Sequence, residues 1–217
     1  MLALVVAGCS SAAHRVAQPP PSLTTSSAAL TTTTTEPATT TSTTVDPGTL
    51  PQTRARPSGT DPAFLARMNL LWQAIVTGDP SVAVPAFFPE PAYLQVKAIT
   101  NADADWHQRL LRLYNADIAR LHARVAGQPA TLVSIDVPDA AATWVLPGAE
   151  YNKGSYWRVY GTVVHYLVGG RAATFPVRSL ISWRGEWYVV HLGPWNQPGT
   201  VYSPALGAGA LGPPGGC

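Results

Sequence analysis

The chain has 217 residues, with 14 Lys and Arg against 12 Asp and Glu, and a formal net charge of +2. This balance argues against a nucleic-acid-binding domain, because phosphate-binding surfaces concentrate much more positive charge. All seven Trp lie between residues 72 and 195, and residues 10 to about 60 contain no aromatic residue. Only about 140 residues can therefore form a hydrophobic core, which corresponds to a single domain.

The two cysteines, Cys9 and Cys217, lie outside the part of the sequence that can form a core. The core is therefore predicted to contain no disulfide and no thiolate metal site. Twelve Arg against two Lys, together with abundant Ala, Gly and Pro, indicates a GC-rich bacterial genome.

The first nine residues are an apolar run that ends in Val6-Ala7-Gly8-Cys9. This tetrapeptide resembles a bacterial lipobox, in which the cysteine takes a diacylglycerol and becomes the new N-terminus. The resemblance implies that residues 1–9 are a lipoprotein signal remnant and that Cys9 is lipidated. Because Met1 is not followed by the basic residues that begin a secretory signal, either the true start lies upstream or the match is a chance one. A lipid anchor predicts a location at the outer face of the cell membrane, in the cell envelope.

Residues 10–60 are predicted to be a disordered linker. Twelve Thr fall between residues 24 and 44, interleaved with Ser, Ala and Pro. Such a stretch buries too little apolar area to offset its ordering entropy. Residues 194–217 form a Gly/Pro-rich tail that is also predicted to be disordered, which leaves residues 61–193 for the domain.

Helical periodicity dominates the first half of this domain. Asp61 and Pro62 are a helix start, and apolar residues then recur at helical spacing until Gly78. A short second helix is predicted over residues 79–89, whereas residues 92–99 fit either a strand or one more helical turn.

A long amphipathic helix is predicted over residues 105–125. Asp105 and Gln108 match a capping box at its start, and Gly127 ends it. Its polar face carries four arginines, namely Arg109, Arg112, Arg120 and Arg124.

The period then changes to alternation, which predicts five strands over residues 131–137, 142–146, 155–168, 173–183 and 186–192. Gly169-Gly170 and Arg184-Gly185 are predicted hairpin turns. Gly161 is expected to leave space where a helix or ligand approaches the longest strand. The face of that strand predicted to point to the core carries Trp157, Val159, Val163, His165 and Leu167.

Helices followed by an antiparallel meander predict an α+β fold. At this point residues 61–193 resemble the NTF2-like or cystatin-like cone, in which a curved sheet wraps around a long helix. The resemblance rests on element order and on the closing hairpin Ser182-Trp183-Arg184-Gly185-Glu186-Trp187, similar to the W-x-G-x-W endings of such domains in exported bacterial proteins. A helix over residues 92–99 would remove the first strand of that fold.

Known catalytic and metal motifs are absent from the sequence, including G-x-S-x-G, the P-loop, H-E-x-x-H and G-x-G-x-x-G. Asn101-x-Asp103-x-Asp105 imitates a calcium loop but lacks its Gly and its closing Glu, so Asp105 is interpreted as a helix cap. His107, His122 and His191 show no zinc-ligand spacing. No metal and no cofactor are therefore expected.

His165 and Asp117 are the candidate catalytic residues. The resemblance implies this role, because enzymes on NTF2-like cones use a pocket His or Asp as a general base. Asp117, at the edge of the apolar stripe of the long helix, could orient His165. The alternative is a buried histidine that bonds to the backbone and has no catalytic role.

Two surfaces are candidates for binding. The four arginines could meet anionic lipid headgroups or an acidic wall polymer, and the alternative is an ordinary solvated helix face. The aromatic-rich strands could expose a platform for sugars or a partner protein, and the alternative is cross-strand pairs that only stabilise the sheet. The tyrosines of this candidate platform are Tyr156, Tyr160 and Tyr166.

Together these patterns favour a membrane-anchored lipoprotein whose domain is a non-catalytic binding module for a protein, a glycan or a hydrophobic ligand. The alternative is a small isomerase or cyclase that uses His165 and Asp117. The expected partners are the membrane, through the lipid anchor, and an envelope protein or wall glycan, with no nucleic acid.

Overall fold

The computed structural model describes residues 45–193. Cys9, the predicted signal and most of the predicted linker lie outside the described residues, as does the tail from residue 194. The helices are α1 (Pro62–Thr77), α2 (Glu90–Val96), α3 (Ala102–Asp105) and α4 (Arg112–Val125). The π-helical stretch η3 (Trp106–Leu111) joins α3 to α4, and three 3-10 turns are η1 (Pro47–Thr49), η2 (Pro80–Ala86) and η4 (Asp139–Ala141). The strands are β1 (Ala130–Asp136), β2 (Thr143–Val145), β3 (Tyr156–Val168), β4 (Arg171–Trp183) and β5 (Glu186–His191).

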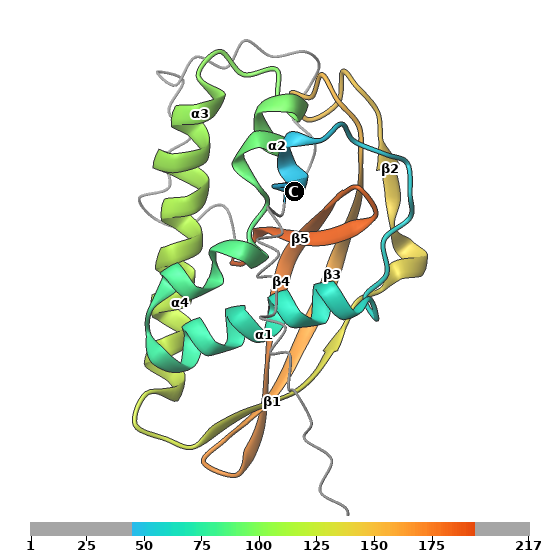
Figure 1. Cartoon of the computed structure of the whole chain (residues 1–217). Coiled ribbons are helices and arrows are strands. Elements are labelled where there is room, and N and C mark those ends of the chain that lie inside the picture. Colours follow the sequence, from blue (N-terminus) through green and yellow to red (C-terminus); the bar gives the residue numbers. More distant parts are fainter. Residues whose placement is uncertain (1–44, 194–217) are drawn as a thin grey trace, which may run out of the picture. The chain divides into compact units, whose positions relative to one another are not determined.

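The strands form one antiparallel sheet in the order β1-β3-β4-β5, and β2 also pairs with β3. Residues 156–158 of β3 pair with β2, and residues 163–168 pair with β1. Figure 1 shows the helices packed against this curved sheet, with α3 and α4 in one long helix at its side. The predicted α+β class is confirmed.

Helix α1 follows directly from its sequence signals. Asp61 caps it, because its Oδ1 accepts from the backbone N–H groups of Ala63 (2.8 Å) and Phe64 (3.2 Å). Gly78 ends it in the left-handed region at φ = +76°, which glycine adopts without strain. The apolar stripe faces the core and buries Phe64, Met68, Leu71, Trp72 and Ile75.

The long helix begins earlier than predicted. Its first element α3 starts at Ala102, with Asn101 in the cap position, and Asp105 lies inside the helix at φ = −65° and ψ = −41°. The interpretation of Asp105 as a helix cap is therefore wrong. Its carboxylate turns into the domain, where Tyr93 and Arg109 bind it. Arg109 is the i+4 neighbour on the same helix, but the sequence pattern does not show that Tyr93 is near.

The ambiguous stretch after residue 89 is helical. Glu90 begins α2, which ends at Val96. Just before it, Phe87 forms a parallel bridge with Val189, and the backbone N–H of Phe88 donates to the Val189 carbonyl at 2.9 Å. The segment between η2 and α2 thus adds a short backbone connection along β5.

The domain begins earlier than predicted, because residues 46–60 pack on the sheet. We call this segment the strap. Gln52 holds it: its Nε2 donates to the carbonyl oxygens of Ser182 (2.9 Å) and Ser155 (3.2 Å), and its Oε1 accepts from the Arg184 N–H at 2.6 Å. Figure 1 shows the strap, in blue, passing beside β2 before α1. The predicted linker boundary at residue 60 is wrong, because composition does not reveal that the Gln52 side chain bonds to backbone groups of β4, of the turn after it and of the residue before β3.

The long strand β3 turns mainly the other face to the core. Of the five residues predicted to face it, only Val159 is fully buried. Trp72 of α1 contacts Tyr166, with ring centroids 5.3 Å apart, so α1 covers the opposite face. Both faces carry apolar side chains, so alternation predicts the strand without deciding its inner side. The buried residues of β3 are Tyr156, Val159, Thr162, Val164 and Tyr166.

Gly161 separates the buried residues Tyr156 and Val159 of β3 from the buried residues that follow it. Its φ of +82° is unfavourable for any residue with a side chain. A Cβ at this position would meet only Pro138 Cγ, at 3.8 Å. The predicted close approach of a helix or ligand is therefore absent at this glycine, whose role in the strand is conformational.

Large aromatic side chains fill the space between the helices and the sheet. Phe87 stacks on Tyr114 with centroids 4.7 Å apart, and Phe88 meets Trp183 edge to face at 6.0 Å.

No helix in residues 45–193 is long and apolar enough to cross a membrane.

Candidate functional site

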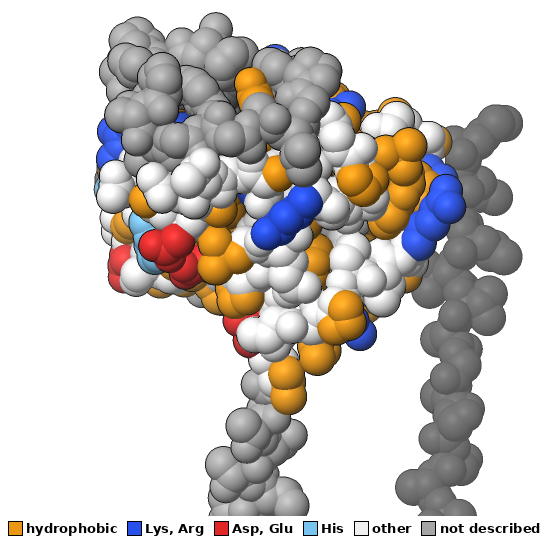
Figure 2. Space-filling view, turned by 90° about the horizontal axis from the view of Figure 1, so that it is seen from above, with side chains coloured by type: hydrophobic (Ala, Val, Ile, Leu, Met, Phe, Trp, Pro, Cys, Tyr) orange, Lys and Arg blue, Asp and Glu red, His pale blue; other side chains and the backbone are white. Residues whose placement is uncertain are grey.

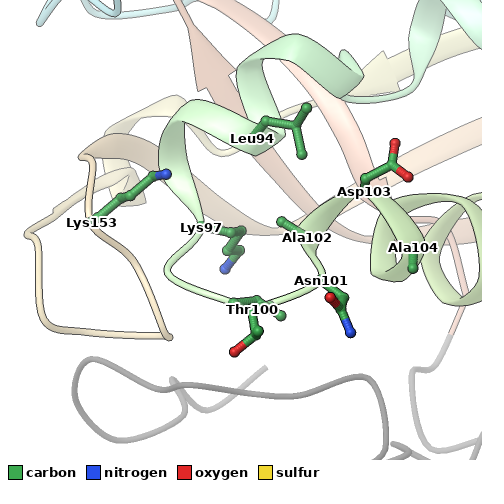
Figure 3. Close-up of a pocket in the computed structure, with 9 residues that line it drawn as sticks. Leu94, Lys97, Thr100, Asn101, Ala102, Asp103, Ala104 and Lys153 are labelled. Atoms are coloured by element: carbon green, nitrogen blue, oxygen red, sulfur yellow. The ribbon is translucent and has the colours of Figure 1, made fainter.

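A hollow of about 360 Å³ opens between α2, the start of α3 and the loop that precedes β3. Lys97 and Lys153, the only two lysines of the chain, both line it. Figure 3 shows these two side chains on neighbouring segments, with Thr100, Asn101 and Asp103 continuing the wall. The remaining lining residues are Leu94, Ile99, Ala102 and Ala104.

Hydrogen bonds between two loops build the lysine side of the hollow. Helix α2 ends at Val96, whose carbonyl accepts from the backbone N–H of Lys153 at 2.7 Å. The next residue, Lys97, is extended and forms an antiparallel bridge with Asn152. Its Nζ donates to the carbonyl of Glu150 at 2.9 Å, which positions the ammonium group. Two positive charges from distant parts of the sequence are thereby brought to one opening.

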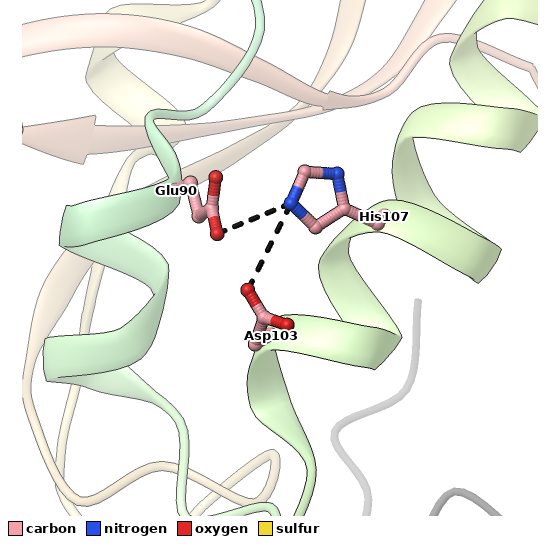
Figure 4. A group of neighbouring side chains, drawn as sticks. All are labelled: Glu90, Asp103 and His107. Atoms are coloured by element: carbon pink, nitrogen blue, oxygen red, sulfur yellow. Dashed lines mark hydrogen bonds and ion pairs between the residues drawn. The ribbon is translucent and has the colours of Figure 1, made fainter.

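Beside the hollow, three side chains with metal-ligand chemistry converge, namely Glu90, Asp103 and His107 (Figure 4). His107 Nε2 lies 3.2 Å from Glu90 Oε1 and 3.8 Å from Asp103 Oδ1. The side chain of His107 is 50% exposed, that of Glu90 30% and that of Asp103 70%. Asp103 also lines the hollow, so the cluster and the hollow are contiguous.

The electrostatics of this cluster follow from two carboxylates at short range. Burial raises the pKa of the Glu90 carboxyl, the neighbouring Asp103 raises it further, and His107 opposes the rise. Like charges this close are stabilised by a positive charge between them. The arrangement therefore suits a proton or a cation.

Two residues further along α3, Asp105 points into the domain and is only 2% exposed. Its carboxylate accepts from the Tyr93 hydroxyl and from Arg109, at 2.6 Å from Nε and 2.5 Å from Nη2. Burial, and then the charge of Asp105, raises the pKa of Tyr93 well above its usual value. The phenol therefore remains a hydrogen-bond donor, and we call this trio the internal cluster.

His191 lies near the internal cluster. Part of the residue reaches the surface, but burial of the ring, aided by the charge of Arg109, lowers its pKa to about 3. His191 is therefore neutral at physiological pH.

The two predicted catalytic residues contact different partners. His165 is on the outer face of β3, 38% exposed, with its Nε2 2.9 Å from Asp136 Oδ2. Asp117 is buried on α4, where it pairs with Arg120 at 3.2 Å and accepts from the Gly193 N–H at 2.8 Å. The prediction of a buried His165 in the core is wrong because β3 turns this residue outward.

The tyrosines predicted to form an exposed platform are largely enclosed. Tyr156 and Tyr166 are 2% and 5% exposed, because they lie on the face of β3 that the helices cover. The Tyr156 hydroxyl donates to Glu150 Oε2 at 2.5 Å. Tyr160 is half-buried under the Arg158 guanidinium, 4.7 Å from its ring centroid. Burial excludes Tyr156 and Tyr166 from a binding surface.

The predicted arginine face is interrupted. Arg112, Arg120 and Arg124 are exposed, whereas Arg109 turns inward to Asp105. Figure 2 shows the described Lys and Arg side chains of one face as separate groups among polar and hydrophobic surface. The role of these arginines at an anionic surface stays a prediction.

Sequence reasoning did not find the residues around the hollow. Asp103 and His107 have the i, i+4 spacing of neighbours on one helix face, which was a usable signal. Glu90, Lys97 and Lys153 carried no such signal, because only tertiary contacts bring them close to the other residues of the hollow and its cluster.

No protein-family model, curated protein or solved structure gives a significant match to this chain.

Proposed function

We propose that this protein is a non-catalytic binding module of the cell envelope. Its domain binds an anionic group of an envelope polymer, such as a wall glycan, and Cys9 holds it by a lipid at the outer face of the membrane. The observation that carries the binding function is the hollow that gathers both lysines of the chain. An ammonium group is a compact donor that suits carboxylate and phosphate oxygens, and Thr100 and Asn101 add polar groups to the same wall.

Binding is favoured over isomerase or cyclase chemistry by the placement of the two candidate catalytic residues. A general base needs an orienting partner within hydrogen-bond reach and a substrate beside it. The enzyme hypothesis needs Asp117 to orient His165. Instead, His165 pairs with the exposed Asp136, and Asp117 pairs with Arg120 and with the backbone of Gly193.

We also propose a relationship of the domain to the NTF2-like or cystatin-like cone. Its support is the long helix beside a curved antiparallel sheet and the closing hairpin of β4 and β5 around Arg184-Gly185. Helix α2 stands where that fold would have its first strand, so the relationship concerns the long helix and the later strands.

The binding proposal is tested by co-sedimentation of the purified full-length chain with isolated cell walls, before and after their anionic polymers are removed. Each basic residue near an anionic surface contributes about 1 kcal/mol, so Lys153→Gln should weaken binding about fivefold and Lys97→Gln/Lys153→Gln about 30-fold. The matched control is Arg171→Gln, which removes one charge from the exposed hairpin of β3 and β4.

Circular dichroism should show the same fold for all variants, because the substitutions keep a polar side chain at both positions and the Lys97 bond to the Glu150 carbonyl is only partly buried. Equal binding by wild type and the double variant, or undiminished binding to walls without anionic polymers, would contradict the proposal.

The anchor is tested separately, in cells that express the gene from its natural start. Cys9→Ser should abolish fatty-acid labelling and release the protein from membranes, whereas Cys217→Ser should leave both unchanged. Labelling that persists in Cys9→Ser would overturn the anchor and leave the binding proposal standing.

A further inference from the structure

The ligand atoms of Glu90, Asp103 and His107 are spaced close to what a small divalent cation requires. Three ligands at about 2.1 Å from a tetrahedral metal ion are separated from one another by about 3.4 Å. His107 Nε2 already lies 3.2 Å and 3.8 Å from the two carboxylate oxygens, and the three ligand atoms lie within 4.8 Å of one another. Small side-chain rotations suffice to close this set around one ion.

The backbone that carries these side chains is fixed by buried contacts next to each of them. Trp106, beside His107, donates from Nε1 to the carbonyl of Phe88 at 2.9 Å, and both residues are buried. The Tyr93 hydroxyl of α2 donates to Asp105 of α3, which adds a second bond between the two segments. The two segments are thus held at a fixed distance from each other. The three ligand side chains lie beside these buried bonds, at the surface of the domain.

This arrangement is the kind of preorganisation that metal sites use. The supporting groups are buried and hydrogen-bonded, and the ligands remain accessible. Figure 4 shows Glu90 reaching from α2 toward Asp103 and His107, which project from the next helix along the chain.

The donor set indicates the class of cation. One imidazole nitrogen and two carboxylate oxygens suit first-row divalent transition metals, and zinc binds this combination of ligands in tetrahedral sites. Two carboxylates balance the charge of the ion. Three protein ligands leave a fourth position open to water or to a ligand.

We propose that Glu90, Asp103 and His107 bind one divalent transition-metal ion, of which Zn²⁺ is the representative. The ion would lie at the edge of the hollow, because Asp103 lines that hollow too. This site does not depend on the proposed polymer binding, since its ligands are different from the two lysines.

The test is calorimetric titration of Zn²⁺ alone into the tag-free, full-length chain, with Cys9 and Cys217 alkylated so that thiols do not compete. One equivalent should bind to the wild type. Asp103→Asn and His107→Gln should each weaken this binding at least about tenfold. X-ray absorption of the zinc complex should show only nitrogen and oxygen ligands at about 2.0–2.1 Å, with one imidazole.

The matched control is His165→Gln, which removes a partly exposed histidine that also contacts a carboxylate. It should bind zinc like the wild type. Asp103 is 70% exposed, so Asp103→Asn should keep the fold and its thermal transition without metal. The proposal is overturned if the wild type shows no saturable binding below about 100 µM Zn²⁺, or if Asp103→Asn and His107→Gln bind as tightly as the wild type.

Discussion

Two aspartates of α3, only two residues apart, have opposite environments. Asp105 is 2% exposed and is held by Tyr93 and Arg109 in the internal cluster. Asp103 is 70% exposed and lies 3.8 Å from His107 at the rim of the hollow. Both belong to one helical turn, but their side chains project on different sides of it.

The difference shows how burial separates structure from function in acidic residues. A buried carboxylate needs charged and hydrogen-bonding partners to offset its desolvation, so its oxygens are already occupied. An exposed carboxylate near another acid has little to lose from a new ligand. The internal cluster therefore stabilises the domain, whereas the cluster of Glu90, Asp103 and His107 at the rim of the hollow is available to bind a ligand.

The largest effect is expected from breaking the internal cluster. Asp105→Ala removes the carboxylate that Tyr93 and Arg109 both bind, and should lower the free energy of unfolding by about 3–5 kcal/mol. Urea denaturation followed by circular dichroism measures this loss. A change below about 1 kcal/mol would mean that the buried trio contributes little to the fold.

A smaller effect that depends on pH is expected from His191, near the internal cluster. The pKa of His191 is about 3 in the folded protein and 6.5 in its usual state, so between these values only the unfolded chain binds the proton. The free energy of unfolding should therefore fall as the pH falls, by about 1.6 kcal/mol between pH 6.5 and 5. His191→Gln and His191→Asn should both flatten this slope in urea denaturation at a series of pH values; slopes parallel to the wild type would contradict the assignment.

The smallest effect is expected at the rim. Asp103→Asn keeps the shape of an exposed side chain, so the free energy of unfolding should change by less than about 0.5 kcal/mol. The same denaturation experiment as for Asp105→Ala measures it. A loss as large as that of Asp105→Ala would show that Asp103 is structural and would erase the contrast between the two aspartates.

Most of the local structure was predictable because its signals are local. Asp61, Pro62 and Gly78 define α1 through capping, a fixed φ and a left-handed end. The five strands lie within about two residues of their predicted bounds, and both predicted hairpin turns are present, at Gly169-Gly170 and Arg184-Gly185. Alternation and turn chemistry act over a few residues, so neighbouring sequence is enough to read them.

Apart from the i, i+4 spacing of Asp103 and His107, the candidate site was not predictable, because its residues come from distant segments. Asp105 looked like a helix cap because its partner Tyr93 becomes visible only when α2 packs beside α3. Its other partner, Arg109, lies four residues further along the same helix, and that spacing was a readable signal. His165 was assigned to the core because both faces of β3 are rich in apolar residues. Lys97 and Lys153, 56 positions apart, line the same hollow because the backbone of Lys153 bonds to Val96 at the end of α2.

The amino-acid sequence by itself determined the extent of the aromatic core, the order of helices and strands, and the α+β class, because composition, periodicity and capping are local properties. Tertiary structure alone decided which face of β3 is buried, that the strap belongs to the domain, and which acids are occupied. Those outcomes depend on which side chains approach from distant segments, and on the cost of removing each charge from water. The same physics that closes the internal cluster leaves the rim with two carboxylates and an imidazole open to a ligand.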